Sequence, residues 1–340
     1  MPIVKELIAD EFGSIVALHS ERIQLRKGGE VVAQAPLMHL EAVIITNRGV
    51  SISADALEAC VERGIPVQFI NREGKPYAAI YASGLSGTVI ARREQMLAYR
   101  DERGVRLALA FATGKIINQA GMLRYVAANR KENAPELAAE LKRCALEVLD
   151  HLSWLPQPEG QTLDEVRGTL LAAEGNAAQH YWAALKLVIP EEYGWPGRVG
   201  RGASDPINAL LNYGYGILYQ QVQRAIILAG LDPYAGFVHT DRPGKPSLVL
   251  DLIEEFRQAA VDRVVVGLAA RRFRAERDGE GLLTSETRRT FAKHVLDHLE
   301  SQMRYRGQRH PLRAIIQMQA RAIAAYLRGD AAAYEPYQAE

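Results

Sequence analysis

The segment ASGLSGT, residues 82–88, separates two parts of the chain that have different hydrophobic patterns. Its small residues and glycines favour a flexible connection. Before it, short β-branched runs alternate with turn residues, which is typical of strands. After it, apolar residues recur with the helical period. The sequence therefore predicts an α+β protein: a small β-rich N-terminal domain over residues 1–82, a linker over 83–88 and a larger all-α domain over 89–328.

Individual elements follow from the same patterns. Lys27-Gly28-Gly29 interrupts a β-branched run and predicts a hairpin. LEAVIIT and IPVQFIN are candidate buried strands, and the segment between them reads as a helix that begins after Ser53 and ends at Gly64. The tail GDAAAYEPYQAE, residues 329–340, is expected to be loose or irregular. Later helices are expected near residues 89–100, 104–130, 134–152, 163–187, 204–230, 247–277, 285–304 and 311–327.

Composition limits the class of protein. A chain of 340 residues with 48% hydrophobic residues is long and apolar enough for a sizeable core. The net charge of +1 gives no global attraction to nucleic acid, so any such surface must be local. Cys60 and Cys144 fit no metal or redox spacing and are expected to be buried free thiols. With no signal peptide and no apolar run long enough for a membrane, we expect a soluble cytoplasmic protein.

The stretch GFVHTDRPGKPSLVLDLIEEFR, residues 236–257, holds three residues suited to chemistry. On a helix, Asp251 and Glu254 are neighbours one turn apart, opposite an apolar stripe. Because like charges at that spacing repel, a cation between them would be stabilising, although a solvated polar face is the simpler alternative. His239 precedes a loop with two prolines and a glycine that could fold back over the start of the helix.

Glu174 favours a functional site over a solvated surface. It lies in the middle of the apolar stripe of the helix predicted over 163–187, where an unpaired carboxylate is costly to bury. A buried ion pair, for example with Arg167 two turns earlier, is the alternative to a bound metal. One histidine and two or three carboxylates make a hard site that suits Mg²⁺ or Mn²⁺ better than zinc. Such sites serve phosphoryl transfer, and no nucleotide-binding or hydrolase motif is present.

Basic residues are interleaved with these acidic positions and predict a local surface for a nucleic-acid backbone. Each basic run alone is more often a solvated helix face. The helix predicted over 204–230 carries polar side chains in an apolar setting, which form interior hydrogen bonds, support the metal ligands or, as at Tyr213 and Arg201, contact the DNA backbone. The predicted DNA-binding residues are Arg201, Tyr213, Arg224, Arg242, Lys245, Arg257, Arg271 and Arg272.

Three ordered motifs now carry a resemblance to a known family: RGASDPINALLNYGYGILY (201–219), GLDPYAGFVH (230–239) and SLVLDLIEEFR (247–257). With AAEGNAAQHYW (172–182) upstream, they resemble the CRISPR-associated endonuclease and integrase of the spacer-acquisition module. The resemblance covers most of the chain and implies a Mg²⁺ or Mn²⁺ site at Glu174, His239 and Glu254. Many relatives have Asp at the position of Glu254, so Asp251 remains a further candidate catalytic residue.

The resemblance also implies an activity and partners. The 3′-hydroxyl of a short double-stranded DNA fragment would attack a phosphodiester at the edge of a CRISPR repeat, and water in its place would give endonuclease activity. The implied partners are a second copy of the chain, joined largely through the N-terminal domain, and a small ferredoxin-like second CRISPR-associated protein that bridges two dimers into a heterohexamer. The alternatives are a non-catalytic DNA-binding scaffold and a metal phosphohydrolase of small nucleotides.

Overall fold

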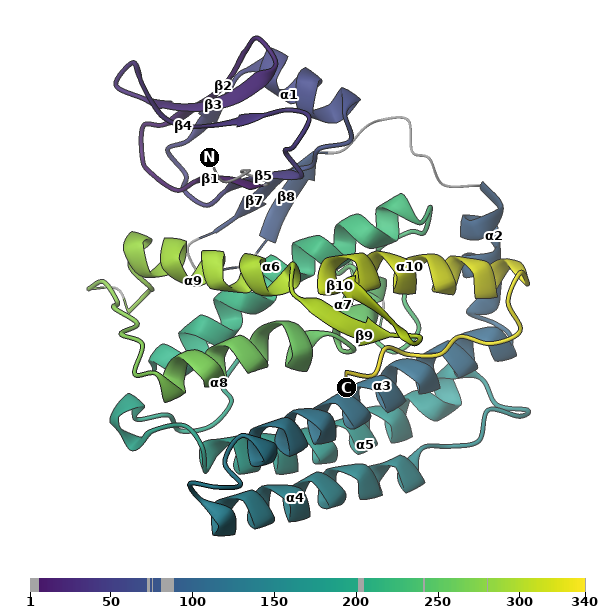
Figure 1. Ribbon diagram of the computed structural model, residues 1–340. Coiled ribbons are helices and arrows are strands. Elements are labelled where there is room, and N and C mark those ends of the chain that lie inside the picture. Colours follow the sequence, from purple (N-terminus) through teal and green to yellow (C-terminus); the bar gives the residue numbers. More distant parts are fainter. Residues whose placement is uncertain are drawn as a thin grey trace.

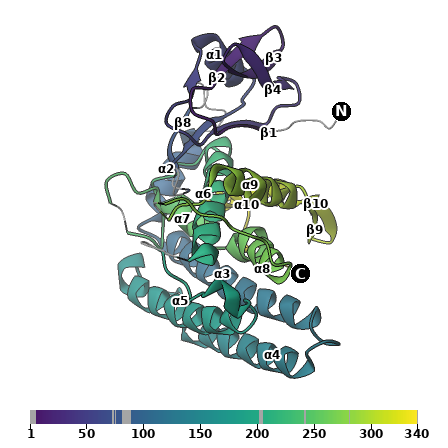
Figure 2. The same cartoon turned by 90° about the vertical axis from the view of Figure 1, so that its left-hand side faces the viewer.

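The computed structural model describes residues 6–71, 74, 76–80, 89–200, 205–240, 242–279 and 281–339. It shows a small β-rich domain above a larger helical domain, as Figures 1 and 2 show from two sides. The predicted fold class is therefore confirmed. The predicted linker over 83–88 and the boundary at residue 82 lie outside the described residues.

Two sheets and one helix form the described part of the N-terminal domain. The first sheet has the order β1-β5-β7-β8, parallel except for the pair β7 and β8. The second has the order β4-β3-β2-β6, and the predicted hairpin at Lys27-Gly28-Gly29 joins β3 to β4. The elements are β1 Glu6–Ala9, β2 Ile15–His19, β3 Arg22–Lys27, β4 Glu30–Pro36, β5 Ala42–Ile45, β6 Ser51–Ile52, α1 Ala54–Glu62, β7 Val67–Ile70 and β8 Pro76–Ile80.

Strand β5 lies between two hydrophobic cores, which explains its uninterrupted apolar sequence. Val43 and Ile45 pack into the core of the N-terminal domain. Ala42 and Ile44 point the other way and join the core of the helical domain. A central strand that is buried on both faces has no polar alternation. The first sheet is thus the layer on which the two domains meet.

The helical domain follows the predicted order of helices. Asp101 and Asp205 accept hydrogen bonds from the first turns of α3 and α6, and Thr162 forms a capping box with Glu165 at the start of α5. The elements are α2 Val89–Ala98, α3 Glu102–Ala128, α4 Pro135–Asp150, η1 His151–Trp154, α5 Leu163–Lys186, η2 Glu191–Tyr193, α6 Pro206–Leu228, α7 Ser247–Ile253, η3 Gln258–Asp262, α8 Arg263–Ala270, α9 Ser285–Leu299, β9 Gln302–Tyr305, β10 Gln308–Pro311 and α10 Leu312–Arg328.

The single helix predicted over 247–277 is wrong in two respects. The chain tightens into a turn after Ile253 and then widens into a π-helical segment, η3. The helix resumes as α8 and ends at Ala270, because Arg272 adopts a left-handed backbone with φ 58°. A π-helical turn inserts one residue and redirects the side chains around it, which often marks a functional site.

The helix predicted over 285–304 is also too long, and the helical domain is not entirely α. Helix α9 ends at Leu299, and β9 and β10 form an antiparallel hairpin. Its two-residue turn, Arg306-Gly307, has positive φ at both positions. That geometry is the type I′ turn that matches the twist of the two strands.

Helix α6 touches the N-terminal domain almost backbone to backbone. A Cβ on Gly216 would lie 1.6 Å from the carbonyl oxygen of Gly74, so glycine is required there. Tyr213, one turn earlier, is buried at 2% exposure and packs against Gly74 and Phe291. Arg313 of α10 adds ion pairs to Glu6, Glu41 and Glu300, so that both domains are joined by packing and by charge.

The structure bears on two smaller expectations. Cys60 and Cys144 are buried free thiols, as predicted. None of the helices in the described part of the chain combines the length and the apolar character needed to cross a membrane.

Candidate active site

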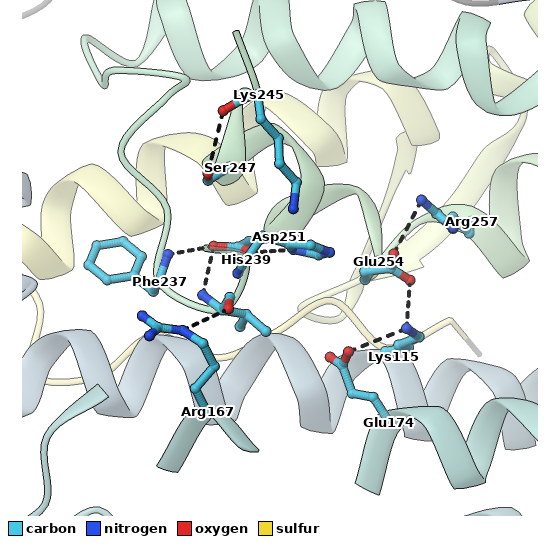
Figure 3. Close-up of polar contacts among 11 residues, drawn as sticks. Lys115, Arg167, Glu174, Phe237, His239, Lys245, Ser247, Asp251, Glu254 and Arg257 are labelled. Atoms are coloured by element: carbon cyan, nitrogen blue, oxygen red, sulfur yellow. Dashed lines mark hydrogen bonds and ion pairs between the residues drawn. The ribbon is translucent and has the colours of Figure 1, made fainter. Parts of the chain in front are cut away.

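The predicted site residues converge where α3, α5 and α7 approach one another (Figure 3). Glu174 comes from the middle of α5, and Glu254 follows the last residue of α7. Both carboxylates are buried, at about one-twentieth exposure. His239 comes from the loop before α7 and Asp251 from α7 itself. Residue 174 and the segment that carries residues 239, 251 and 254 are far apart in sequence, yet they meet in one region.

A lysine that the sequence did not predict lies between the two glutamates. Lys115 Nζ of α3 is 3.4 Å from Glu174 Oε2 and 3.2 Å from Glu254 Oε2. Arg257 Nη2 is 3.2 Å from the other oxygen of Glu254. Buried charges need such pairing because the interior does not solvate them. The cation is thus shared between Glu174 and Glu254, and not between Asp251 and Glu254.

The surroundings move the pKa values of the two glutamates in opposite directions. Burial raises the pKa of Glu174, assisted by the nearby charge of Glu254, and Lys115 offsets only part of that rise. Burial also acts on Glu254, but Arg257, Lys115 and His239 outweigh it and lower its pKa to about 2. Glu254 is therefore the fixed negative charge of the pair. Glu174 is the group that gains most from an additional cation.

Asp251 organises the loop that carries His239. Its carboxylate accepts hydrogen bonds from the backbone N–H groups of Phe237, Val238 and His239, at 2.6, 3.1 and 3.0 Å. His239 Nδ1 lies 2.7 Å from Asp251 Oδ1, so Nδ1 donates, and in the neutral imidazole the lone pair is then on Nε2. Gly236 permits this wrapping, because a Cβ there would lie 2.7 Å from Asp251 Oδ2. With four donors around it, Asp251 positions His239 and does not face Glu174.

A second buried carboxylate, Asp262, lies near Arg257 and acts on its charge. Tyr181 and Tyr215 donate hydrogen bonds to the two oxygens of Asp262 in η3, at 2.6 and 2.5 Å. The guanidinium of Arg257 lies 4.7 Å from the centre of the Tyr215 ring. The π-helical turn places Asp262 against α5 and α6 together. It thereby ties Glu254, through Arg257, to the rest of the domain.

Arg167 does not pair with Glu174, so the predicted partner is wrong, but the predicted alternative of a buried ion pair is present, with Lys115 as the cation. It hydrogen-bonds the carbonyl oxygen of Val238 and the hydroxyl of Tyr99, and it pairs with Asp164. Its contact with Val238 places it beside the loop of His239. The prediction that Asp251 and Glu254 form a solvated face is also wrong, because both are buried.

The predicted DNA-binding residues are scattered. Lys245 points toward Asp251 and His239 in Figure 3, and Arg242 is exposed in the same loop. Arg271 is exposed, whereas Arg272 pairs with Glu192.

Three further positions do not form a simple basic surface. Tyr213 is buried at the domain junction, so its placement does not support a DNA contact. Arg224 borders a hollow of about 310 Å³ at that junction, with Glu41 and Arg313. Arg201 lies outside the described residues.

The donor set fits a hard divalent ion. Two carboxylates and one imidazole converge, and the buried Glu254 Oε2 has the ion pair with Lys115 as its partner in place of a well-aligned hydrogen bond. Among the described residues, no three His, Cys, Asp or Glu side chains are already arranged as a metal cage, and Lys115 Nζ takes the space between the carboxylates. A metal would therefore bind at Glu174, Glu254 and His239 only as Lys115 moves aside.

Comparison with solved structures places this two-domain arrangement in a known class. A casposase bound to integration product shares the fold with a TM-score of 0.82 and 22% identity, over 98% of this chain and 93% of that chain. A Cas1 protein from Thermotoga maritima shares it with a TM-score of 0.76 and 21% identity, over 98% and 100%. The chain thus has the fold of two-domain Cas1-like proteins.

Sequence comparison then gives the family. The family model described as CRISPR associated protein Cas1 matches residues 7–297. A relative from Archaeoglobus fulgidus, "CRISPR-associated endonuclease Cas1 1", is 39% identical over 95% of this chain and 96% of its own length. A protein of the same name from Francisella tularensis subsp. novicida is 33% identical over 98% and 99%. This chain belongs to the Cas1 family.

Proposed function

We propose that this protein is a metal-dependent DNA endonuclease and integrase that inserts short DNA fragments into a CRISPR array. The observation that carries the proposal is the buried cluster of Glu174, Lys115 and Glu254, with His239 held beside it by Asp251. Curated relatives are named endonucleases, and the structural neighbour named a casposase is bound to integration product. A DNA-binding scaffold would have no need of two crowded, buried glutamates beside an oriented imidazole.

The residues of the site have separable roles in this reaction. Glu254, with its low pKa, and Glu174 would hold Mg²⁺ or Mn²⁺, with His239 Nε2 as a third ligand. When bound, the ion supplies Lewis-acid stabilisation of the scissile phosphate and the leaving 3′-oxygen. Asp251 keeps Nδ1–H of His239 occupied, so that Nε2 presents a lone pair to the site.

The cations of the site would stabilise the charge of the phosphate. Lys115, released from the glutamates, and Arg257 are the two nearest positive groups to Glu254. Charge-assisted hydrogen bonds from such groups are stronger than neutral ones. Exchange of one phosphodiester for another changes little free energy, so the reaction needs no ATP. Attack by a DNA 3′-hydroxyl would give integration, and attack by water would give cleavage.

The proposed partners are double-stranded DNA with 3′-hydroxyl ends, CRISPR repeat DNA, a second copy of this chain and the second CRISPR-associated protein. Solved neighbours include structures named a Cas6-RT-Cas1–Cas2 complex and a TtCas1-DNA complex, which support the DNA and the small partner. The heterohexamer and the homodimer through the N-terminal domain are proposals of the same kind. So is the cytoplasmic location.

A strand-transfer assay tests the proposal. Purified protein, with and without its small partner, is incubated with a labelled 3′-hydroxyl duplex and a supercoiled repeat plasmid in Mg²⁺, Mn²⁺ or EDTA. We expect metal-dependent joining that is lost in Glu174→Gln and kept in Glu136→Gln, an exposed matched control on α4. If EDTA and Glu174→Gln leave joining and nicking unchanged, the proposed site is wrong.

A further inference from the structure

The C-terminal tail, predicted to be loose, is irregular but firmly docked. After α10 the chain crosses back over α3 (Figure 1). Tyr337 is buried at 1% exposure, and its ring stacks on Phe256 with centroids 5.1 Å apart. Pro336 packs on α3 at Gly114, where a Cβ would lie 2.8 Å from the proline. A tail without secondary structure is thus part of the core.

The tail supplies most of the donors to a buried carboxylate that the proposed reaction does not use. Glu255 is 0% exposed, and no Lys, Arg or His in the described part of the chain forms an ion pair with it. It accepts hydrogen bonds from the Tyr334 hydroxyl at 2.7 Å, the Tyr337 backbone N–H at 2.9 Å and Gln319 at 3.0 Å. A buried carboxylate without a cation depends on such donors. Undocking the tail would remove two of the three.

Asn118 of α3 ties the tail and Glu255 together. Its side-chain amide donates to the carbonyl oxygens of Glu255 and Tyr337, each at 2.8 Å. Its oxygen accepts from the backbone N–H of Ala339 at 2.8 Å. Asn118 lies one turn from Lys115 on α3. The tail therefore contacts the same turn of α3 that carries Lys115.

The backbone that carries Glu254 needs this external support. Between α7 and η3, the N–H groups of Glu254, Glu255 and Phe256 reach back to the third preceding residue, at 3.4, 3.3 and 2.9 Å. These bonds form a tight turn and not a regular α-helix. The backbone hydrogen bonds of residues 254–256 therefore hold Glu254 less firmly than those of an α-helix would. The hydrogen bonds to the side chain and to the carbonyl oxygen of Glu255 therefore hold this turn in place.

We infer that the C-terminal tail, residues 334–339, is a strap that positions Glu254, and that Tyr334 and Tyr337 are positioning residues for the catalytic site. The inference rests on the proposed function for its catalytic consequence. Its structural consequence is independent of that function: releasing the strap loosens the turn at 254–256 while the rest of the helical domain stays folded. Loss of the strap would move Glu254 away from Lys115 and Glu174.

Hydrogen exchange and Mn²⁺ binding test the strap in full-length protein without DNA. Tyr337→Ala removes the stacked ring, and Tyr334→Phe removes only the hydroxyl that binds Glu255. Tyr77→Phe, an exposed tyrosine of β8, is the matched control. We expect faster amide exchange at residues 252–257 in both strap variants, unchanged exchange in α4, and Mn²⁺ affinity weaker by about 10-fold or more.

The outcomes separate the strap from the proposed function. Faster exchange confined to the tail itself, with wild-type exchange at 252–257 and wild-type Mn²⁺ affinity, would overturn the strap. If wild-type protein neither binds Mn²⁺ nor cleaves DNA, the proposed function fails, and exchange at 252–257 still decides the strap. If Tyr337→Ala unfolds, Tyr334→Phe gives the answer, because its ring still fills the same space.

Discussion

Replacing Asp251 by asparagine tests the central packing argument of the site. The carboxylate accepts four hydrogen bonds, two on each oxygen. An amide has one accepting oxygen. If its NH2 faces Phe237 and Val238, two buried N–H groups lose their acceptor; if it faces His239, the imidazole can change tautomer and accept, and the His239 backbone N–H loses its acceptor. An unsatisfied donor costs about 1–3 kcal/mol, so in the less costly orientation Asp251→Asn should lower the free energy of unfolding by about 1–3 kcal/mol.

Urea denaturation followed by circular dichroism measures this loss. The matched control is Asp297→Asn on the exposed side of α9, which should stay within about 0.5 kcal/mol of wild type. In the folded fraction, metal-dependent DNA cleavage should fall by about 10–100-fold, because His239 loses the group that orients it. If Asp251→Asn is as stable as Asp297→Asn, Asp251 does not hold the loop, and our account of His239 is refuted.

The remaining predictions concern the charges of the site. Glu174→Gln should abolish metal-dependent cleavage without lowering the free energy of unfolding in urea, because it relieves the repulsion with Glu254; a destabilised variant would instead favour a purely structural ion pair. Lys115→Met should lower the metal-free unfolding free energy by about 3–5 kcal/mol and gain more than wild type on adding Mn²⁺ in thermal melts; an equal gain would mean that the lysine does not compete with the metal. Burial raises the pKa of Asp262 from 3.8 to about 6, despite hydrogen bonds from Tyr181 and Tyr215. The folded protein therefore keeps a proton that the unfolded chain releases between those values, so the contribution to stability falls as the pH rises from about 4 to 6; Asp262→Asn should remove about 3 kcal/mol of that fall, measured by urea titrations across the window.

The sequence predicted the elements well wherever a period or a turn residue was decisive. The β-rich start, the hairpin at Lys27-Gly28-Gly29 and most helices follow from local patterns. The helix predicted over 247–277 failed because η3 is held by long-range hydrogen bonds to Asp262, which leave no periodic trace. The hairpin at Arg306-Gly307 did leave a signal in the sequence, a glycine between two β-capable runs. The arginines around it were interpreted as a charged helix face.

Part of the site was predictable, because a carboxylate in the apolar stripe of a predicted helix is expected to be buried. Glu174 was found in that way, and its three companions came from one stretch and a family resemblance. Lys115 was not, because one lysine on a long helix looks like any solvated residue. Asp251 and Glu254 share a helix face, yet they serve different partners, since the tight turn after Ile253 rotates Glu254 toward α3. The tail lacks any periodicity, so its docking onto Glu255 could not be foreseen.

The contact between Gly74 and Gly216 also has a consequence for building chimaeras of this protein. The carbonyl group of the Gly74 turn sits where the side chain of residue 216 would be, so the two positions form a single joint. A donor N-terminal domain grafted onto this helical domain would have to bring a turn of the same path. A donor helical domain would have to bring a glycine at the position of Gly216. A chimaera that is joined in the linker without matching these two positions would therefore have two folded domains that cannot pack against each other.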